Sequence, residues 1–273
     1  MTFALVFLNT ADPSLGRVDR ASLPQQALME MVIEGIANKE KICGDADEPK
    51  DIEEWKGVTV EDGEVVEVYW ERFELQGSLH FEWLPISVRI FLVKWNHNLT
   101  GTLDCASLPI SLKMLDIGSN AFTGSIDLER LPEGMEEIGI SENMFCGSLK
   151  LHSLPDTMTR FTADKNKFSG SVDLTQLPVA MLTLFLEHNR LSGSVVLTQL
   201  PGGLCAIDIS ENDLSGSLKL HSLPHTLTEF TADKNKFSGS VDLTQLPVAM
   251  LTLFLEHNRL SGSVVLTQLP GGL

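Results

Sequence analysis

The sequence predicts an α/β solenoid, in which short coils stack side by side and each adds one strand to a parallel β-sheet. Three observations predict this fold. A Leu-Pro pair recurs about every 23 residues from Leu108 to Leu269, apolar residues stand at constant offsets between the pairs, and an asparagine follows each expected strand. A fixed period of about 20 to 29 residues is typical of repeats that bury their apolar faces against their sequence neighbours.

The expected strands come from apolar residues separated by one position. Leu115 and Ile117 share one face of an extended segment, while Asp116 between them points the opposite way. We therefore expect the inward side chains to form a continuous dry interior. The equivalent inward pairs of the later coils are Ile138 and Ile140, Phe161 and Ala163, Leu184 and Leu186, Ile207 and Ile209, Phe230 and Ala232, and Leu253 and Leu255.

The turn after each strand carries an asparagine, whose amide can both donate and accept where the backbone cannot bond itself. We expect the stacked coils to link these amides into a ladder. Its predicted members are Asn120, Asn143, Asn166, Asn189, Asn212, Asn235 and Asn258. A glycine that follows each asparagine, such as Gly124, suits a turn with positive φ or little room. The short apolar segment after it predicts short second strands or 3-10 turns on the convex side.

One coil matches the pattern L-x-x-L-x-L-x-x-N-x-L, and it closely resembles the leucine-rich repeat family. The matching residues are Leu112, Leu115, Ile117, Asn120 and Phe122. The resemblance implies a horseshoe or right-handed superhelix whose concave parallel sheet usually binds protein or peptide. The segment Phe168 to Ser171, with the Leu-Pro pair that follows, resembles repeats of protist and plant-type receptors.

The N-terminal residues resemble the cap of plant-type leucine-rich repeat receptors. Ser22 and Pro24 before an apolar stripe predict a helix, and residues 54–70 predict a hairpin that turns at 61–63. The resemblance implies a capping disulfide. Val60 stands where its second cysteine would be, so Cys43 lacks that partner.

We divide the chain into an N-terminal extension (1–20), a cap with a degenerate first repeat (21–83) and the repeats (84–273), of which the last is truncated. The coil from Leu84 carries one additional residue around Asn96 to Leu99, which should bulge outward. Residues 161–204 recur unchanged as 230–273, and this offset of three whole coils preserves the stacking register. Ending at Leu273 would expose the apolar edge of the last coil, so we expect a fragment or further coils in the natural product.

The four cysteines do not form a disulfide framework, because Cys105, Cys146 and Cys205 occupy different offsets within their coils. Free, partly buried thiols favour a reducing compartment and hence a cytoplasmic protein. The alternative is an extracellular or cell-surface location, which the cap resemblance favours. The apolar run from Phe3 to Leu8 lacks a basic leader and is too short to span a bilayer.

Composition restricts the partners and the chemistry. A net charge of −17 argues against nucleic acid and anionic membranes as partners, because both require clustered lysine and arginine. The acidic surface either aids solubility or recruits a basic partner. We expect no catalytic residue, cofactor or metal: no phosphate loop, zinc motif or nucleophile elbow occurs, and His188 and His257 are one repeat position in two copies.

Outward strand positions are the candidate ligand-binding residues. Phe185 and Phe254 suit an aromatic anchor for a partner, although packing against neighbouring strands is the alternative. An acidic column either binds the ligand or is simply solvated. It passes through Asp164, Glu187, Asp233 and Glu256. The full predicted set is Arg160, Thr162, Asp164, Phe185, Glu187, Asp208, Ser210, Asp233, Phe254 and Glu256.

These observations predict a protein-protein interaction scaffold that binds a protein or peptide on its concave face, and the acidic surface allows this ligand to be basic. The main alternative is the ectodomain of a cell-surface receptor or adhesin. A third possibility is a structural spacer, whose interactions would not change when Phe185 and Glu187 are replaced by alanine. The sequence does not specify the oligomeric state.

Overall fold

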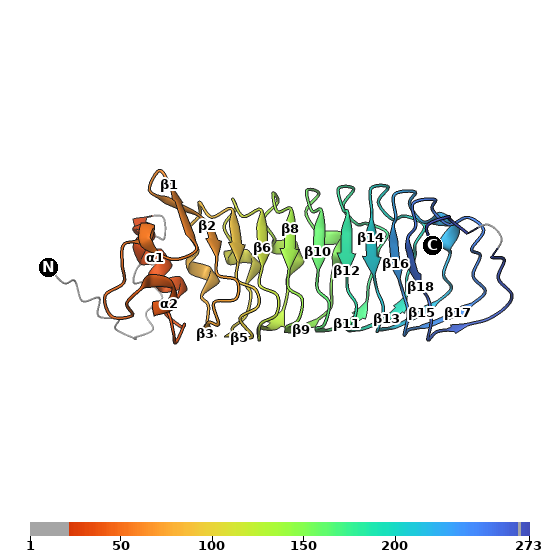
Figure 1. Cartoon of the computed structure of the whole chain (residues 1–273), viewed down its shortest axis with the longest axis horizontal. Coiled ribbons are helices and arrows are strands. Elements are labelled where there is room, and N and C mark those ends of the chain that lie inside the picture. Colours follow the sequence, from red (N-terminus) through yellow and green to blue (C-terminus); the bar gives the residue numbers. More distant parts are fainter. Residues whose placement is uncertain (1–21, 267–268) are drawn as a thin grey trace, which may run out of the picture.

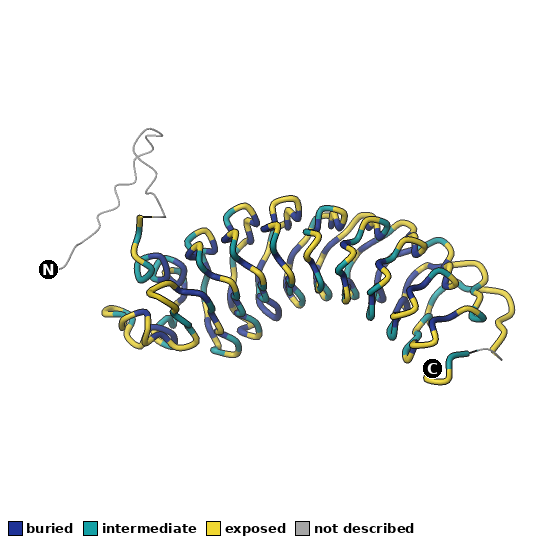
Figure 2. Tube along the Cα trace, turned by 90° about the horizontal axis from the view of Figure 1, so that it is seen from above, coloured by how far each residue is buried: buried dark blue, intermediate teal, exposed yellow. Residues whose placement is uncertain are grey.

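The computed structural model describes residues 22–266 and 269–273, and it confirms the predicted solenoid. Successive coils lie side by side from the cap to the last repeat, so the cap and the last repeat lie at opposite ends of the stack (Figure 1). The stack curves into an arc in which buried residues line the inside of each coil (Figure 2). The predicted extension, residues 1–20, lies outside the described residues.

A ten-stranded sheet runs along the concave side, and its order follows the chain: β1-β2-β4-β6-β8-β10-β12-β14-β16-β18. Every pairing from β2 onward is parallel, and Leu115 pairs with Phe91 on one side and Ile138 on the other. The strands are β4 (Ile90–Leu92), β6 (Met114–Asp116), β8 (Glu137–Gly139), β10 (Arg160–Thr162), β12 (Thr183–Phe185), β14 (Ala206–Asp208), β16 (Glu229–Thr231) and β18 (Thr252–Phe254), after β1 (Val58–Glu61) and β2 (Glu64–Tyr69) of the cap.

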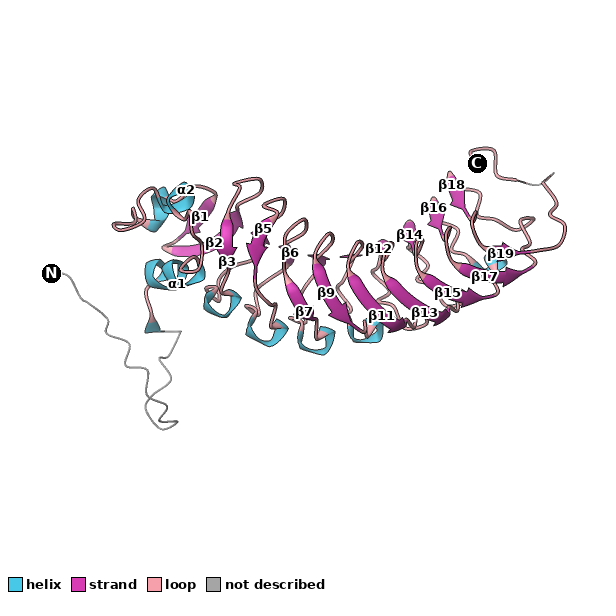
Figure 3. Ribbon diagram, turned by 90° about the horizontal axis from the view of Figure 1, so that it is seen from below, coloured by secondary structure: helices cyan, strands magenta, loops and turns pink. Residues whose placement is uncertain are grey.

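A second parallel sheet follows the asparagine turns on the flank of the solenoid, where Figure 3 shows its strands broadside. Its strands are β7 (Thr123–Ser125), β9 (Met144–Gly147), β11 (Lys167–Ser171), β13 (Arg190–Ser194), β15 (Asp213–Gly216), β17 (Lys236–Gly239) and β19 (Arg259–Leu260), and β3 (Gln76–Ser78) pairs with β5 (Asn98–Thr100) nearby. The recurring glycine is required here. Gly193 has φ 84°, and a Cβ on it would stand 3.4 Å from the Cβ of Ser171 in the preceding coil.

Short 3-10 helices occupy the convex side of several coils (Figure 3). They are η3 (Phe81–Trp83), η4 (Cys105–Ser107), η5 (Leu128–Arg130), η6 (Leu151–Ser153) and η7 (Leu220–Ser222). Aspartates begin two of them: Asp104 accepts from the backbone N–H of Ala106 at 3.1 Å and Asp127 from that of Glu129 at 3.3 Å. Along the stack, a helical turn takes up more width than a strand, and neighbouring strands lie about 4.8 Å apart. The stack therefore curves, with the sheet on its concave side.

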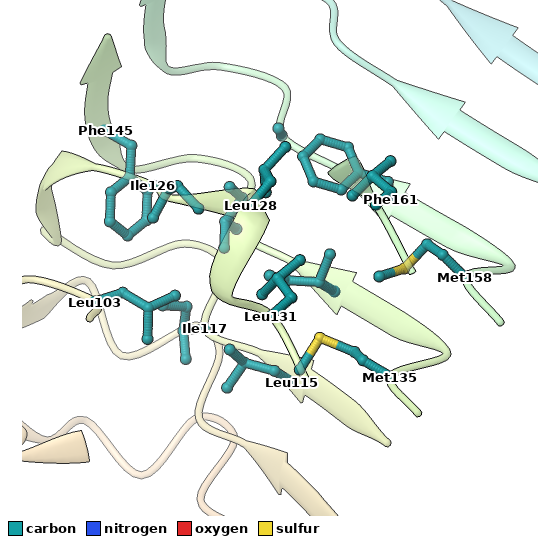
Figure 4. Close-up of a cluster of buried hydrophobic side chains, with 14 of the residues drawn as sticks. Leu103, Leu115, Ile117, Ile126, Leu128, Leu131, Met135, Phe145, Met158 and Phe161 are labelled. Carbon is teal, nitrogen blue, oxygen red and sulfur yellow. The ribbon is translucent and has the colours of Figure 1, made fainter. Parts of the chain in front are cut away.

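The interior is a single apolar core built from the predicted positions. In Figure 4 the strand residues Leu115 and Phe161, with Ile117 just after β6, pack with Leu128 and Leu131, which come from the convex side of a coil. The phenylalanines after the asparagines stack from coil to coil: the ring centroids of Phe122 and Phe145 are 6.4 Å apart, as are those of Phe145 and Phe168. Each coil therefore buries its neighbour's apolar edge.

The cap contains the predicted helix and hairpin. Helix α1 (Gln25–Val32) begins after Pro24, which stands at the N-cap position predicted for Ser22, because proline's fixed φ suits the first turn. A short α2 (Glu40–Cys43) and a 3-10 turn η2 (Ile52–Glu54) precede the β1–β2 hairpin, and β2 continues the concave sheet. Within the described residues no helix has the length and apolar composition needed to cross a membrane.

The four cysteines are free, but they are not uniformly part-buried. Cys43 and Cys105 are buried, Cys205 is half-buried, and Cys146 is exposed on β9. The expectation of part-buried thiols is therefore wrong for Cys146, because its position on the flank alternates outward next to inward Phe145.

The asparagines hold neighbouring coils together through backbone groups rather than through one another. The Nδ2 of Asn143 donates to the Ile117 carbonyl of the preceding coil at 3.0 Å, and its Oδ1 accepts from the backbone N–H of Phe122 at 2.9 Å. Nδ2 also donates to two carbonyls of its own coil, those of Ile140 and Ser141. The ladder thus links amide to backbone, and it extends to Asn96, which the sequence analysis did not include.

The additional residue of the Leu84 coil interrupts this pattern once. Asn98 donates its backbone N–H to the carbonyl of Asn96 at 2.8 Å across a tight turn at His97, which has φ 62°. In the coils of Asn120 to Asn235, the equivalent N–H donates to the asparagine Oδ1 of the next coil. The Oδ1 of Asn120 is therefore buried without a hydrogen-bond donor among the described residues.

We predict that Asn143→Ala destabilises the chain more than Asn120→Ala. Both residues are 8% exposed, but the Oδ1 of Asn143 accepts a hydrogen bond and that of Asn120 does not. Asn143→Ala should lower the free energy of unfolding by about 3 kcal/mol, and Asn120→Ala should lower it by about 2 kcal/mol. Chemical denaturation measures both, and equal losses would contradict the assigned role of Oδ1.

Candidate functional site

The concave sheet presents three outward columns of side chains, and the predicted site residues fall into them. Register places Thr162, Phe185 and Asp208 in one column, with Thr231 and Phe254 further along it. Arg160 lies in the column before it and is exposed. The column after it, which we call the acidic row, contains Asp164, Glu187, Ser210, Asp233 and Glu256. The structure therefore aligns the predicted acidic column and leaves Asp208 beside it.

Glu187 is the second member of the acidic row. Its Oε2 is buried and accepts no hydrogen bond from the described part of the chain. Burial raises the pKa of this carboxyl from 4.5 to about 8, and the neighbouring charges of Asp164 and Asp208 contribute to that rise. The centre of the concave face thus holds a carboxyl oxygen that lacks both a donor and a counter-ion within bonding distance.

The flanking carboxylates have partners, but burial still dominates them. The Ser141 hydroxyl donates to Asp164, and the backbone N–H of Ser210 donates to Asp208 at 2.8 Å. Burial nevertheless raises the pKa of both carboxyls above its ordinary value. Three adjacent coils therefore carry carboxylates whose charge the protein itself only partly stabilises.

The C-terminal members of the predicted set differ in burial. Asp233 is buried, with Lys234 Nζ 4.0 Å from its Oδ2, and Ser210 is also buried. Glu256 is exposed, and Phe254 is 51% exposed. Its duplicate Phe185 is half-buried, because a further coil lies on that side of β12. Thr162 is half-buried.

Sequence reasoning missed a hollow in the N-terminal half of the concave face. It has a volume of about 310 Å³, and Leu92, Met114, Asp116, Gly139 and Thr162 contribute to its lining. A second depression of about 200 Å³ adjoins it and reaches Asp164, sharing Lys94, Asp116 and Thr162 with the first. The available signal was a pair of glycines, Gly118 and Gly139, at outward positions where other coils carry side chains.

The edge of this hollow carries a fixed charge network. Lys94 Nζ lies 3.1 Å from Glu71 Oε1 and 3.1 Å from Asp116 Oδ2. The Arg72 guanidinium and the Lys94 ammonium lie 4.4 Å and 4.6 Å from the centroid of the Trp95 ring. Lys94 therefore neutralises Asp116, in contrast to the acidic row, where Glu187 Oε2 has no hydrogen-bond or ion-pair partner in the described residues.

Solved structures resemble the fold, although no protein-family model and no curated protein matches the chain. The leucine-rich repeat ectodomain of the Arabidopsis thaliana receptor kinase GASSHO1/SCHENGEN3, in complex with CASPARIAN STRIP INTEGRITY FACTOR 2, has a TM-score of 0.76 at 21% identity over 88% of this chain. The PEPR1–AtPEP1 structure has a TM-score of 0.72 at 22% identity over 88%. A plant ice-binding protein has a TM-score of 0.64 at 18% identity over 87%.

The lengths of these proteins differ. The chain spans 30% of the GASSHO1/SCHENGEN3 ectodomain and 36% of PEPR1, but 87% of the ice-binding protein. At these identities the comparison supports a shared fold. It confirms the stacked concave sheet.

We predict that Glu187→Gln stabilises the chain at high pH. The unfolded chain loses the Glu187 proton near pH 4.5 and the folded chain near pH 8, so stability falls as pH rises between these values. Glutamine removes this penalty. Its advantage over the natural chain should grow by about 2 kcal/mol between about pH 5.5 and pH 9, after allowance for solvent screening.

Urea denaturation at the two pH values measures the change, with Glu256→Gln as the control. Glu256 has the same sequence neighbours in the duplicated coil, but it is exposed. A pH-independent difference for Glu187→Gln, or an equal effect of both variants, would contradict the buried carboxyl.

Proposed function

Because the chain has the leucine-rich repeat fold, we propose that it binds a basic peptide or protein segment, in extended form, along its concave face. The observation that carries the proposal is the unpartnered Oε2 of Glu187, flanked by Asp164 and Asp208. An ammonium or guanidinium group of a ligand would supply the missing donor and the missing charge. The proposed role is binding rather than catalysis.

The shape of the face supports an extended ligand. Each outward column of side chains runs across the parallel strands from β2 to β18, and neighbouring strands lie about 4.8 Å apart. A peptide that runs along the columns meets one coil after another, so several weak contacts add along its length. The rigid sheet loses little conformational freedom on binding.

The similar receptor structures support a peptide ligand, since one of them, with a TM-score of 0.53, is the plant peptide hormone receptor RGFR1 in complex with RGF2. We also propose, as the alternative to an independent scaffold, that the chain is part of a cell-surface receptor or adhesin. The fold and the N-terminal cap support this alternative, and the peptide-binding face is the same in both.

We predict that Glu187→Gln weakens binding of a fluorescent octalysine peptide about tenfold, because it removes one charge-assisted hydrogen bond. Fluorescence anisotropy at physiological salt and about pH 9, where the folded chain has lost the Glu187 proton, measures the affinity. Glu129→Gln is the control, since Glu129 is exposed on the convex turn η5 and carries the same charge. If both variants weaken binding equally, the peptide binds through general charge attraction, and the proposed binding site on the concave face is wrong.

A second candidate function rests on the flank sheet. The residues before and after each recurring glycine form two rows, exposed or half-buried, of mostly hydroxyl side chains. The rows are Thr123, Cys146, Ser169, Ser192, Ser215, Ser238 and Ser261, and Ser125, Ser148, Ser171, Ser194, Ser217, Ser240 and Ser263. A rigid array with a fixed repeat can order water in a fixed repeat, and a protein of similar fold and length binds ice.

We predict for this second candidate that the chain inhibits ice recrystallisation and that Ser171→Lys with Ser194→Lys abolishes the effect. Two lysines would break the flat hydroxyl array without entering the core, because both serines are exposed. Thr252→Lys on the concave face is the control. If ice crystals grow as fast with the unsubstituted chain as in buffer alone, this function is excluded.

A further inference from the structure

The flank sheet gathers positive charge that neither function proposed above uses. Its strands β11 to β19 lie side by side (Figure 3), and each begins with an exposed charged residue, followed by outward serines. The charged residues are Lys167, Arg190, Asp213, Lys236 and Arg259. Four cations and one carboxylate give this face a net charge of +3, in a chain whose net charge is −17.

Three of the four cations have no partner in the protein. Lys236 Nζ lies 2.6 Å from Asp213 Oδ1, so these two charges neutralise each other. The side chains of Lys167, Arg190 and Arg259 form no ion pair and no hydrogen bond within the part of the chain that the structure describes. Their charge is therefore available to a ligand.

The two borders of the flank sheet do not cancel this charge. Toward the concave face, Lys165 pairs with Glu142 and Lys234 pairs with Glu211. Toward the convex side, Lys150 pairs with Glu129. The remaining charged side chains of that border are Asp173, Lys219 and Asp242, all exposed. Cations and carboxylates nearly balance along both borders, so the flank sheet stays the positive face.

The register of the flank strands places a serine directly across from three of the cations. The pairs are Ser169 with Arg190, Ser215 with Lys236, and Ser238 with Arg259. Neighbouring strands lie about 4.8 Å apart, so one oxyanion reaches a cation and a hydroxyl at the same time. Ser169 and Ser238 are exposed, and their hydroxyls donate to no group in the described residues.

Two depressions mark this face where it meets the convex side. One has a volume of about 560 Å³, and Ser217, Lys219, Ser240 and Ser263 contribute to its lining. The other, of about 320 Å³, shares Ser217 and Lys219 with the first and includes Ser194. Hydroxyl groups and one cation therefore line both depressions, as a ligand rich in neutral polar groups and negative charge requires.

The chemistry of the face favours a sulfated polysaccharide over other polyanions. A sulfate group, like a phosphate, presents three terminal oxygens that accept hydrogen bonds from a cation and from nearby hydroxyls. The remaining serines suit the hydroxyl groups of the sugar rings. Single-stranded nucleic acids require aromatic side chains on which bases stack, but Phe168 and Phe237 of the flank strands are buried in the core.

We propose that the flank sheet binds a sulfated polysaccharide that runs across strands β11 to β19, with sulfate groups beside Arg190 and Arg259. This site is separate from the concave face and does not depend on the function proposed there. One chain therefore holds a polysaccharide on its flank and a basic peptide on its concave face.

Binding of the whole chain to immobilised dextran sulfate tests the ligand class, with uncharged dextran and polyglutamate as comparison surfaces. At physiological salt we expect binding to dextran sulfate that is at least tenfold tighter than binding to polyglutamate, and none to dextran. Equal affinity for polyglutamate would overturn the assignment to sulfated polysaccharides. An unsubstituted chain that fails to bind dextran sulfate would overturn the site itself.

Paired arginine variants locate the site. Arg190→Gln with Arg259→Gln should lower the affinity for dextran sulfate about tenfold by removing two unpaired cations. Arg89→Gln with Arg130→Gln is the control, because it removes two exposed positive charges that lie outside the flank sheet. The control should change affinity less than about twofold. Equal losses in the two pairs would reveal general charge attraction and overturn the site.

A serine pair tests the contact between cation and hydroxyl at constant charge. Ser169→Ala with Ser238→Ala should lower the affinity about threefold, because each substitution removes one hydrogen bond beside an arginine. Unchanged affinity would overturn the proposed arrangement. Circular dichroism confirms that each variant is folded. Octalysine binding should be the same in all flank variants, so failure of this site and failure of the concave-face proposal are distinguishable.

Discussion

The structure depends on the hydrogen bonds by which each asparagine joins its own coil to the one before it. In Asn166, for example, Nδ2 donates to the Ile140 carbonyl of the preceding coil at 2.9 Å, and Oδ1 accepts from the backbone N–H of Phe145 at 3.0 Å. The asparagine turn separates the concave strand from the flank strand. Satisfying the backbone there fixes the register of both sheets, and the apolar side chains then pack in one arrangement.

This constraint makes the concave face a rigid surface whose chemistry depends on neighbours that are one coil apart in the sequence. Asp164, Glu187 and Asp208 come from three coils, and each is partly buried by the side chains beside it. The protein tolerates three poorly compensated carboxylates because the sheet beneath them cannot rearrange to separate them. Stored electrostatic cost of this kind is common where a surface is built to receive a ligand.

The internal duplication separates the effect of sequence from the effect of position. Phe185 and Phe254 have identical sequence neighbours, as do Glu187 and Glu256, yet in each pair the second residue is more exposed. The coil from Leu204 covers the first copy, whereas β18 is the edge strand of the concave sheet. A repeat residue in a solenoid therefore acquires its environment from the stack and not from its own coil.

The sequence by itself determined the coil period, the inward leucines and the asparagine turns, because the repeat and the spacing within one coil are local properties. It also placed Arg160, Asp164 and Glu187 on the outward face. Only the tertiary structure decided that the Oδ1 of Asn120 and the Oε2 of Glu187 are buried and meet no hydrogen-bond donor in the described residues, and that the Asp116 carboxylate lies over Gly139. Each of these depends on how close a side chain of the next coil comes, and that distance is set by stacking and curvature.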